Sequence, residues 1–120
     1  MCILVVDDEP EIRRAVETVL TNAGYQTMGV ENALEAMQLL LTWPGEFTCL
    51  VSDFHMGTGP NGSELIEMVR GAYPALPCIL VTAQPDVVDP GWRIEHDVSL
   101  IAKPFSRTHL ANAVQERLYA

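Results

Sequence analysis

Five short apolar runs, each followed by a segment with apolar residues at helical spacing, constrain the fold of this chain most strongly. The first run, Cys2–Val6, is continuously apolar rather than alternating, which is typical of a strand covered on both faces. Further strand-like runs lie at 25–30, 47–52, 78–81 and 98–102. This alternation predicts an α/β fold in which a parallel sheet carries helices on both faces.

Residues with special backbone or capping roles mark where the intervening helices begin and end. Pro10 suits the first turn of a helix, and Gly24 suits a helix end. Three residues are expected to cap the second, third and last helices: Asn32, Ser63 and Ser106. Within 84–97, Pro85, Pro90 and Gly91 predict a short or broken fourth helix.

Three further local features are predicted. The run 25–30 is more polar than the others, which indicates a strand near the edge of the sheet. The segment 57–62 holds three glycines and a proline, which predicts a loop. The inward faces of the second and third helices are expected to include Leu41 and Met68.

Composition limits the classes of protein to which the chain can belong. A length of 120 residues suits one domain, expected over residues 1–120. The formal charge of −9, with only seven Lys and Arg, argues against a nucleic-acid-binding face. No apolar run approaches the length of a membrane span, and the run that begins at residue 2 leaves no room for a charged leader. Together with three unclustered cysteines, this favours a cytoplasmic protein.

Polar residues follow four of the five strand-like runs at the point where each run ends. Asp7 and Asp8 follow the first run, and Asp53 follows the third. Thr82 follows the fourth run, and Lys103 follows the fifth. Right-handed crossovers place the carboxyl ends of parallel strands at one edge, where α/β sheets bind ligands. We therefore expect these residues to converge, with Asp53 at the centre.

Three carboxylates at one edge repel each other and call for a cation. At about 4 Å each pair costs roughly 1 kcal/mol in water and about 4 kcal/mol at an effective dielectric constant near 20. Oxygen ligands favour a hard ion such as Mg²⁺, which commonly accompanies a phosphoryl group. An aspartate can act as the nucleophile in phosphoryl transfer, and a lysine and a hydroxyl can hold the phosphoryl oxygens. The constellation predicts phosphorylation of Asp53 with Mg²⁺.

Four segments, VVDDEP, VSDFHM, VTA and AKPF, together resemble the receiver domain of two-component response regulators. They occur in the order and approximate spacing of that family, and the resemblance covers the whole chain. It implies a flavodoxin-like, doubly wound (βα)5 fold with strand order 2-1-3-4-5. It also implies a signalling switch or phosphorelay intermediate that takes its phosphoryl group from a histidine kinase or a phosphotransfer protein. Such a protein is not an enzyme with a separate substrate, because it catalyses only its own phosphorylation and dephosphorylation.

The resemblance implies a role for each residue of the site. Asp53 would be the phosphoacceptor, and Asp8 would bind Mg²⁺ directly with help from Asp7. The remaining expected roles fall to the main-chain carbonyl of His55 as a metal ligand, to Thr82 as a hydrogen-bond donor to the phosphoryl group, and to Lys103 as its ion-pair partner. The peptide bond between Lys103 and Pro104 is expected to be cis.

The sequence departs from the family pattern at three places. Leu100 stands where the family usually has an aromatic residue that swings inward on activation, so an output through a rotating ring is in doubt. Gly57 replaces the usual proline, and the loop MGTGPNG is one residue longer than usual. The longer loop, the weak fourth helix and the aliphatic Leu100 are more similar to receivers attached to hybrid histidine kinases than to those of DNA-binding regulators.

Several alternatives stay open at this point. The first is a degenerate receiver that binds partners without being phosphorylated. Besides a kinase or phosphotransfer protein, a second copy of the chain could be a partner, in a weak homodimer. An aspartate-dependent phosphatase would want a second carboxylate two residues after its nucleophile. His55 stands at that place after Asp53, and Glu9 stands there after Asp7, so this alternative is weakly supported. A nucleotide-binding protein is disfavoured because no glycine-rich phosphate loop follows the first strand. Individually, Asp7 and Asp8 could serve only the next helix's N-terminus, and Lys103 could be a solvated surface residue.

Overall fold

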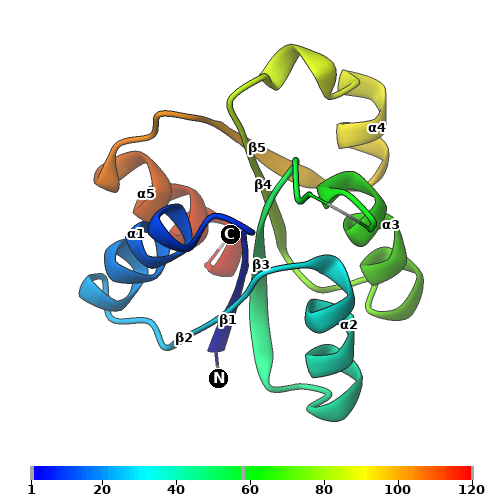
Figure 1. Cartoon of the computed structure of the whole chain (residues 1–120), viewed down its shortest axis with the longest axis horizontal. Helices are drawn as coiled ribbons and strands as arrows, with labels where there is room; N and C mark the ends of the chain where they lie inside the picture. The colour runs from blue at the N-terminus through cyan, green and yellow to red at the C-terminus, as the bar shows by residue number, and fades with distance from the viewer. Residues whose placement is uncertain (1, 58, 120) are drawn as a thin grey trace.

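The computed structural model describes residues 2–57 and 59–119. Five parallel strands form one sheet in the order β2-β1-β3-β4-β5 (Figure 1), which confirms the predicted fold. The strands are β1 (Cys2–Val6), β2 (Thr27–Val30), β3 (Phe47–Asp53), β4 (Cys78–Thr82) and β5 (Val98–Ala102). The helices are α1 (Pro10–Asn22), α2 (Ala33–Thr42), α3 (Gly62–Ala72), α4 (Pro90–Glu95) and α5 (Arg107–Leu118), with a 3₁₀ turn at Pro85–Val87.

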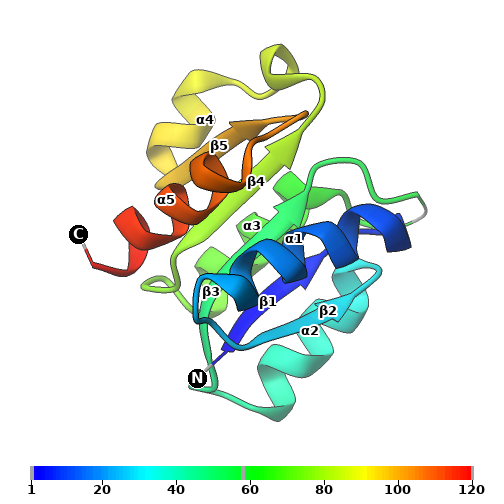
Figure 2. The same cartoon turned by 90° about the vertical axis from the view of Figure 1, so that its left-hand side faces the viewer.

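The helices divide between the two faces of the sheet. Helices α1 and α5 cover one face, and α2, α3 and α4 cover the other (Figures 1 and 2). Alternate residues of β1 enter opposite apolar clusters: Leu4 and Val6 join the α2 and α3 side, and Ile3 and Val5 join the α1 and α5 side. The central strands are therefore mainly apolar on both faces, as a sheet buried on both sides requires, and most of their polar residues lie near the carboxyl ends.

Two of the three predicted helix caps are confirmed, and the third is wrong. Asn32 accepts a hydrogen bond from the Glu35 N–H, and Ser106 accepts one from the His109 N–H. Helix α3 is capped by Asn61 rather than by Ser63, because the helix already begins at Gly62. Asn61 and Glu64 form a reciprocal capping box.

The expectations for the irregular segments are largely confirmed. Strand β2 lies at the edge of the sheet, and it is shorter than the predicted run. The region after β4 is broken into the 3₁₀ turn and the six-residue helix α4. The predicted inward positions of Leu41 and Met68 are wrong, since these side chains are 64% and 37% exposed. Among the described residues, no helix is long and apolar enough to cross a membrane.

Gly62 is the tightest point between the site-bearing strands and the helix that follows them. Its N–H donates to the Phe54 carbonyl at 2.8 Å. A Cβ added there would lie 2.9 Å from Phe54 Cα and 2.8 Å from a Leu80 methyl, and it would collide with the Asp53 carbonyl oxygen. Main-chain atoms cannot swing aside as a flexible side chain can. Only glycine therefore allows α3 to begin this close to the end of β3.

We predict that Gly62→Ala lowers the free energy of unfolding by about 1–3 kcal/mol, the usual range for forcing an extra methyl group into a packed site. Gly71→Ala is the matched control, because a Cβ at this helical glycine meets nothing within 4 Å. That change should raise stability by about 0.5–1 kcal/mol through helix propensity. Urea denaturation of the two variants measures both effects, and equal changes would contradict the packing account.

Candidate functional site

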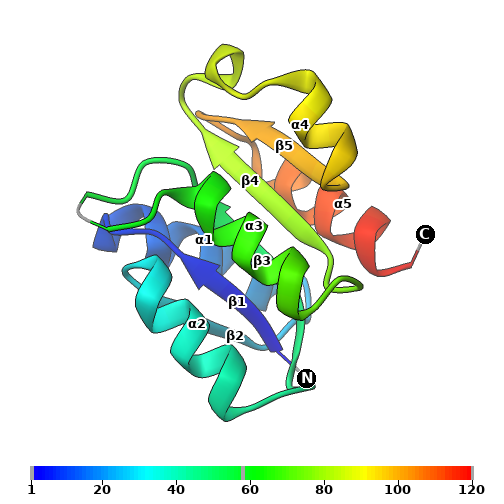
Figure 3. The ribbon, with the colours of Figure 1, turned by 90° about the vertical axis from the view of Figure 1, so that its right-hand side faces the viewer.

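The sheet brings the predicted site residues to one edge. Asp53 and Thr82 are the last residues of β3 and β4, while Asp7 and Lys103 directly follow β1 and β5. These four strands are neighbours in the sheet, and their carboxyl ends point the same way (Figures 2 and 3). Asp8, next to Asp7, joins them at this edge. The convergence predicted from the topology is therefore confirmed.

Lys103 links two of the buried carboxylates. Its Nζ lies 3.1 Å from Asp53 Oδ1 and 3.5 Å from Asp7 Oδ2. The side chains of Asp53 and Asp7 are 5% and 4% exposed, and that of Lys103 is 16% exposed. Lys103 is thus a partner of the acidic residues and not a solvated surface lysine. The peptide bond between Lys103 and Pro104 is cis, as expected.

A fourth carboxylate, that of Glu9, belongs to the acidic cluster. One carboxylate oxygen from each of Asp7, Asp8, Glu9 and Asp53 lies within 4.8 Å of the other three. Asp7 and Asp53 are buried, whereas Asp8 and Glu9 are exposed. Glu9 was not among the predicted metal ligands, and its membership of the cluster became visible only in the structure. An all-oxygen donor set of this kind fits a hard divalent cation such as Mg²⁺.

Burial and the neighbouring charges have opposing effects on the pKa values of Asp7 and Lys103. Burial raises the pKa of Asp7, and the charge of Asp53 raises it further, against the lowering effects of the Glu9 N–H and of Lys103. The Glu9 N–H donates to Asp7 Oδ1 at 2.9 Å. Burial lowers the pKa of Lys103, but the charges of Asp53 and Asp7 outweigh it, so the pKa of Lys103 is raised. The lysine therefore stays protonated beside the carboxylates.

Thr82 reaches the same edge from the neighbouring strand. It is fully buried and lies one residue beyond Val81, the partner of Asp53 in the ladder between β3 and β4. Its hydroxyl oxygen accepts a hydrogen bond from the Gln84 N–H at 3.0 Å. The Lys103 N–H donates to the main-chain carbonyl of Thr82 at 2.8 Å. Thr82 is thus held between the two strands that carry Asp53 and Lys103.

The loop after Asp53 explains one departure from the family pattern. Gly57 has a φ of 56°, which proline, fixed near −65°, cannot adopt. A Cβ at Gly57 would lie 3.2 Å from Asp8 Oδ2, so the loop passes close to the acidic cluster. The additional residue expected in this loop falls in a segment that includes Thr58, which lies outside the described residues. The side chain of His55 is exposed, and the role of its carbonyl as a metal ligand stays a prediction.

Leu100 occupies the place of the usual aromatic switch residue. It is partly buried and packs against the apolar cluster on the α2 and α3 side of the sheet. Phe54 and Trp92 pack against the same cluster. In this structure, a partly buried aliphatic side chain occupies the position.

Comparisons with known proteins agree with this site. The response regulator receiver domain family matches residues 3–115. The response regulator protein FleR of Pseudomonas aeruginosa is 32% identical over 81 residues, which cover 68% of this chain and 16% of FleR. The DNA-binding transcriptional regulator NtrC of Escherichia coli is 34% identical over 83 residues, which cover 69% of this chain and 17% of NtrC. This chain therefore corresponds to about one sixth of the length of these relatives.

Solved structures show the same fold. The response regulator TrrA of Thermotoga maritima, in complex with Mg²⁺ and BeF, has a TM-score of 0.86 and 29% identity, with 98% of each chain covered. The receiver domain of the hybrid histidine kinase CckA has a TM-score of 0.82 and 25% identity, with 98% of this chain and 99% of that chain covered. Since the similar proteins include both a DNA-binding regulator and a hybrid kinase, the type of parent protein stays a prediction. The family match and the convergence of the site residues together show that the chain belongs to the response regulator receiver domain family.

Proposed function

We propose that Asp53 accepts a phosphoryl group from a phosphohistidine of a histidine kinase or phosphotransfer protein, and that the chain acts as a signalling switch or phosphorelay intermediate. The observation that carries this proposal is the contact between Lys103 Nζ and Asp53 Oδ1 at 3.1 Å, within a cluster of four carboxylates. A nucleophilic carboxylate beside a fixed cation suits the transfer of a dianionic group. The whole of residues 1–120 would form this one receiver domain.

The proposed transfer uses the phosphohistidine donor and Asp53, with a proton from solvent for the released imidazole. A carboxylate oxygen of Asp53 attacks the phosphorus of the donor, forming an oxygen–phosphorus bond. The phosphorus–nitrogen bond of the phosphohistidine breaks, and its electron pair stays on the imidazole nitrogen, which takes up a proton. Lys103 pairs with the new phosphoryl oxygens in place of the free carboxylate. Water later cleaves the acyl phosphate and restores Asp53, so the chain transforms only itself and needs no separate substrate.

The donor set supports Mg²⁺ as the cofactor of this step. Asp7, Asp8 and Asp53, with the main-chain carbonyl of His55, would hold the ion, and Glu9 lies within reach of the same cluster. Mg²⁺ would supply positive charge to the phosphoryl oxygens. Independently of the ion, burial of Asp7 and Asp53 excludes water from the side of the cluster that faces the core.

Thr82 would donate its hydroxyl proton to the phosphoryl group. Its oxygen already accepts from the Gln84 N–H, so its proton is free to turn toward a new acceptor.

One alternative, a receiver that binds partners without phosphorylation, draws support from Leu100, because the usual aromatic half of the switch is missing. A cytoplasmic location is part of the proposal. It is supported by the three free cysteines, of which Cys49 and Cys78 are buried with pKa values that burial raises to about 12 and about 11.

Incubation with acetyl phosphate and Mg²⁺ should increase the mass of the protein by one phosphoryl group, because the carboxylate can attack a small acyl phosphate donor as well. Intact-mass spectrometry measures the change. Asp53→Asn removes the nucleophile with little change in shape and should show no increase. An unmodified wild type, or equal modification of the variant, would contradict the proposal and favour the degenerate receiver.

Asp7→Asn should stabilise the metal-free protein at neutral pH by on the order of 1 kcal/mol, the scale of one like-charge contact. The pKa of Asp7 is raised in the folded state, so its ionisation opposes folding. The contribution of Asp7 to stability is present at acidic pH and is lost as the pH rises through the raised pKa. Thermal unfolding from about pH 4 to pH 7 should therefore show a gain for Asp7→Asn that shrinks as the pH falls.

The same variant tests the metal site. Mg²⁺ should raise the Tm of the wild type more than that of Asp7→Asn, because the variant offers one fewer charged ligand. Glu116→Gln, which removes an exposed carboxylate from α5, is the control and should respond to Mg²⁺ as the wild type does. An equal response of the wild type and Asp7→Asn would place the ion elsewhere.

A further inference from the structure

Four segments at the edge of the sheet opposite the phosphorylation site are almost free of charge. They are the ends of α1, α2, α3 and α5 with the connections into β2, β3 and β4, over 21–26, 41–48, 71–77 and 118–119, and we call them the amino edge. They contain a single charged side chain, that of Glu46, in a protein with a formal charge of −9. Two arginines border them: Arg70 donates to the Leu76 carbonyl, and Arg117 pairs with Asp97 beside the start of β5. Figure 2 shows the start of β1 and the end of α5 at this side of the molecule, away from the tips of the strand arrows.

The amino edge is also rich in aromatic residues. It carries five of the eight aromatic side chains: Tyr25, Trp43, Phe47, Tyr73 and Tyr119. Trp43 is 56% exposed and Tyr119 is 73% exposed, and the neighbouring Leu41 is 64% exposed. Enrichment in aromatic residues and depletion of charge are the composition of the core of a protein–protein interface. Exposed apolar groups gathered in this way indicate a docking surface rather than ordinary solvent-facing residues.

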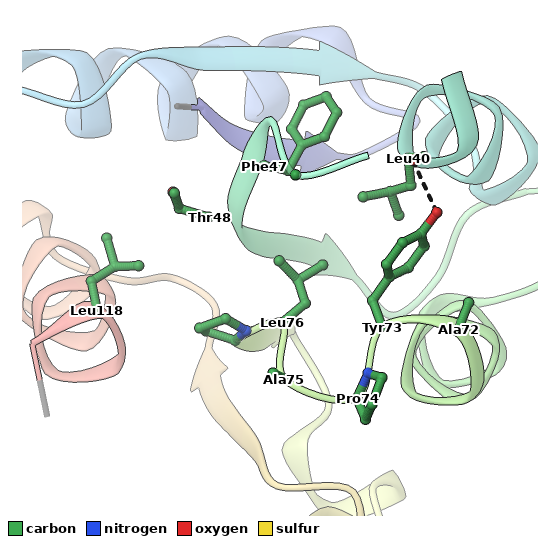
Figure 4. Close-up of a pocket in the computed structure, with 11 residues that line it drawn as sticks. Leu40, Phe47, Thr48, Ala72, Tyr73, Pro74, Ala75, Leu76 and Leu118 are labelled. Atoms are coloured by element: carbon green, nitrogen blue, oxygen red, sulfur yellow. Dashed lines mark hydrogen bonds between the residues drawn. The ribbon is translucent and has the colours of Figure 1, made fainter. Parts of the chain in front are cut away.

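The amino edge contains apolar cavities as well as exposed side chains that project from it. A cavity of about 590 Å³ opens between the end of α2, the start of β3 and the segment 72–77, and Leu76, Phe47 and Leu118 line it (Figure 4). The hydroxyl of Tyr73 donates to the Leu40 carbonyl at 3.0 Å, so the polar atom at this wall already has a partner. Two neighbouring hollows, of about 530 and about 700 Å³, share lining residues with the first and with each other.

We propose that the amino edge binds the amino edge of a second copy of this chain, forming a two-fold symmetric dimer. In such a dimer the same patch serves on both partners, so it must be complementary to itself. A patch that holds both projecting groups, such as Trp43 and Tyr119, and apolar hollows meets this condition. The proposal is independent of the proposed phosphorylation, because the two edges share no residue.

The distribution of charge favours a second copy as the occupant. Ten of the sixteen acidic residues lie at the carboxyl edge or in the first helical turns beside it: Asp7, Asp8, Glu9, Glu11, Glu31, Glu35, Asp53, Glu64, Asp86 and Asp89. Two copies that met there would bring these carboxylates together. When the amino edges meet instead, the acidic edge of each copy faces away from the partner. Each copy is about 30 Å across, so the two acidic edges are separated by several times the screening length of about 8 Å at physiological salt.

Among the described residues, the three most exposed large apolar side chains outside the amino edge have charged neighbours in sequence. Leu34 (65% exposed) precedes Glu35, Ile94 (77%) lies between Arg93 and Glu95, and Val87 (53%) follows Asp86. Pairing through the amino edges also leaves both copies of Asp53 open to a phosphoryl donor. The dimer would therefore present two acceptor sites on opposite sides.

Sedimentation velocity over a concentration series tests the proposal with the whole chain. The wild type should show a reversible monomer–dimer equilibrium that added NaCl does not weaken, since the contact is apolar and salt screens the repulsion between two copies of charge −9. Trp43→Glu and Tyr119→Glu should each raise the dimer dissociation constant at least about tenfold, as loss of an aromatic anchor and burial of a charge require. Far-UV circular dichroism confirms that each variant is folded.

Ile94→Glu is the matched control, because it also replaces an exposed apolar side chain with a charge, on α4 and outside the amino edge. It should dimerise as the wild type does. A wild type that stays monomeric up to about 1 mM would overturn the proposal. So would a dimer that Ile94→Glu disrupts while Trp43→Glu and Tyr119→Glu leave it intact, which would assign the contact to α4.

Discussion

The contact of one lysine with two buried carboxylates depends on the topology of the whole sheet. Lys103 can lie 3.1 Å from Asp53 and 3.5 Å from Asp7 only because β1, β3, β4 and β5 are parallel neighbours with a common carboxyl edge. The pair of contacts offsets part of the repulsion between carboxylates that would otherwise oppose folding. The remaining negative charge is what makes the edge suitable for a cation and a phosphoryl group. Lys103, Asp53 and Asp7 therefore affect both the stability of the fold and the chemistry of the site.

The packing beneath the site keeps this geometry in place. Gly62 lets α3 start against the end of β3, and Asn61 and Glu64 close the first turn by a reciprocal capping box. Gly57 lets the connecting loop pass beside Asp8 with a φ that a proline could not adopt. Gly57 thus connects one departure in the loop sequence to a local backbone requirement, while Gly62 meets a packing requirement.

Much of the fold could be predicted because continuous apolar runs and capping residues are local signals. The strand at the sheet edge, the caps at Asn32 and Ser106, and the broken segment before β5 follow from them. Ser63 was the wrong cap because Asn61, two residues earlier, can also cap a helix, and Glu64 completes the capping box only with Asn61. The exposure of Leu41 and the participation of Glu9 in the acidic cluster depend on tertiary distances, which helical spacing and residue type do not contain.

The identity of the modified carboxylate tests the central claim most directly, since four carboxylates lie within 4.8 Å of one another. Reduction of the acyl phosphate with borohydride converts the modified residue to an alcohol that survives proteolysis and can be located by fragment mass spectrometry. After treatment with a phosphoryl donor, the account predicts conversion at Asp53 alone. Conversion at Asp7, Asp8 or Glu9 in place of Asp53 would contradict it.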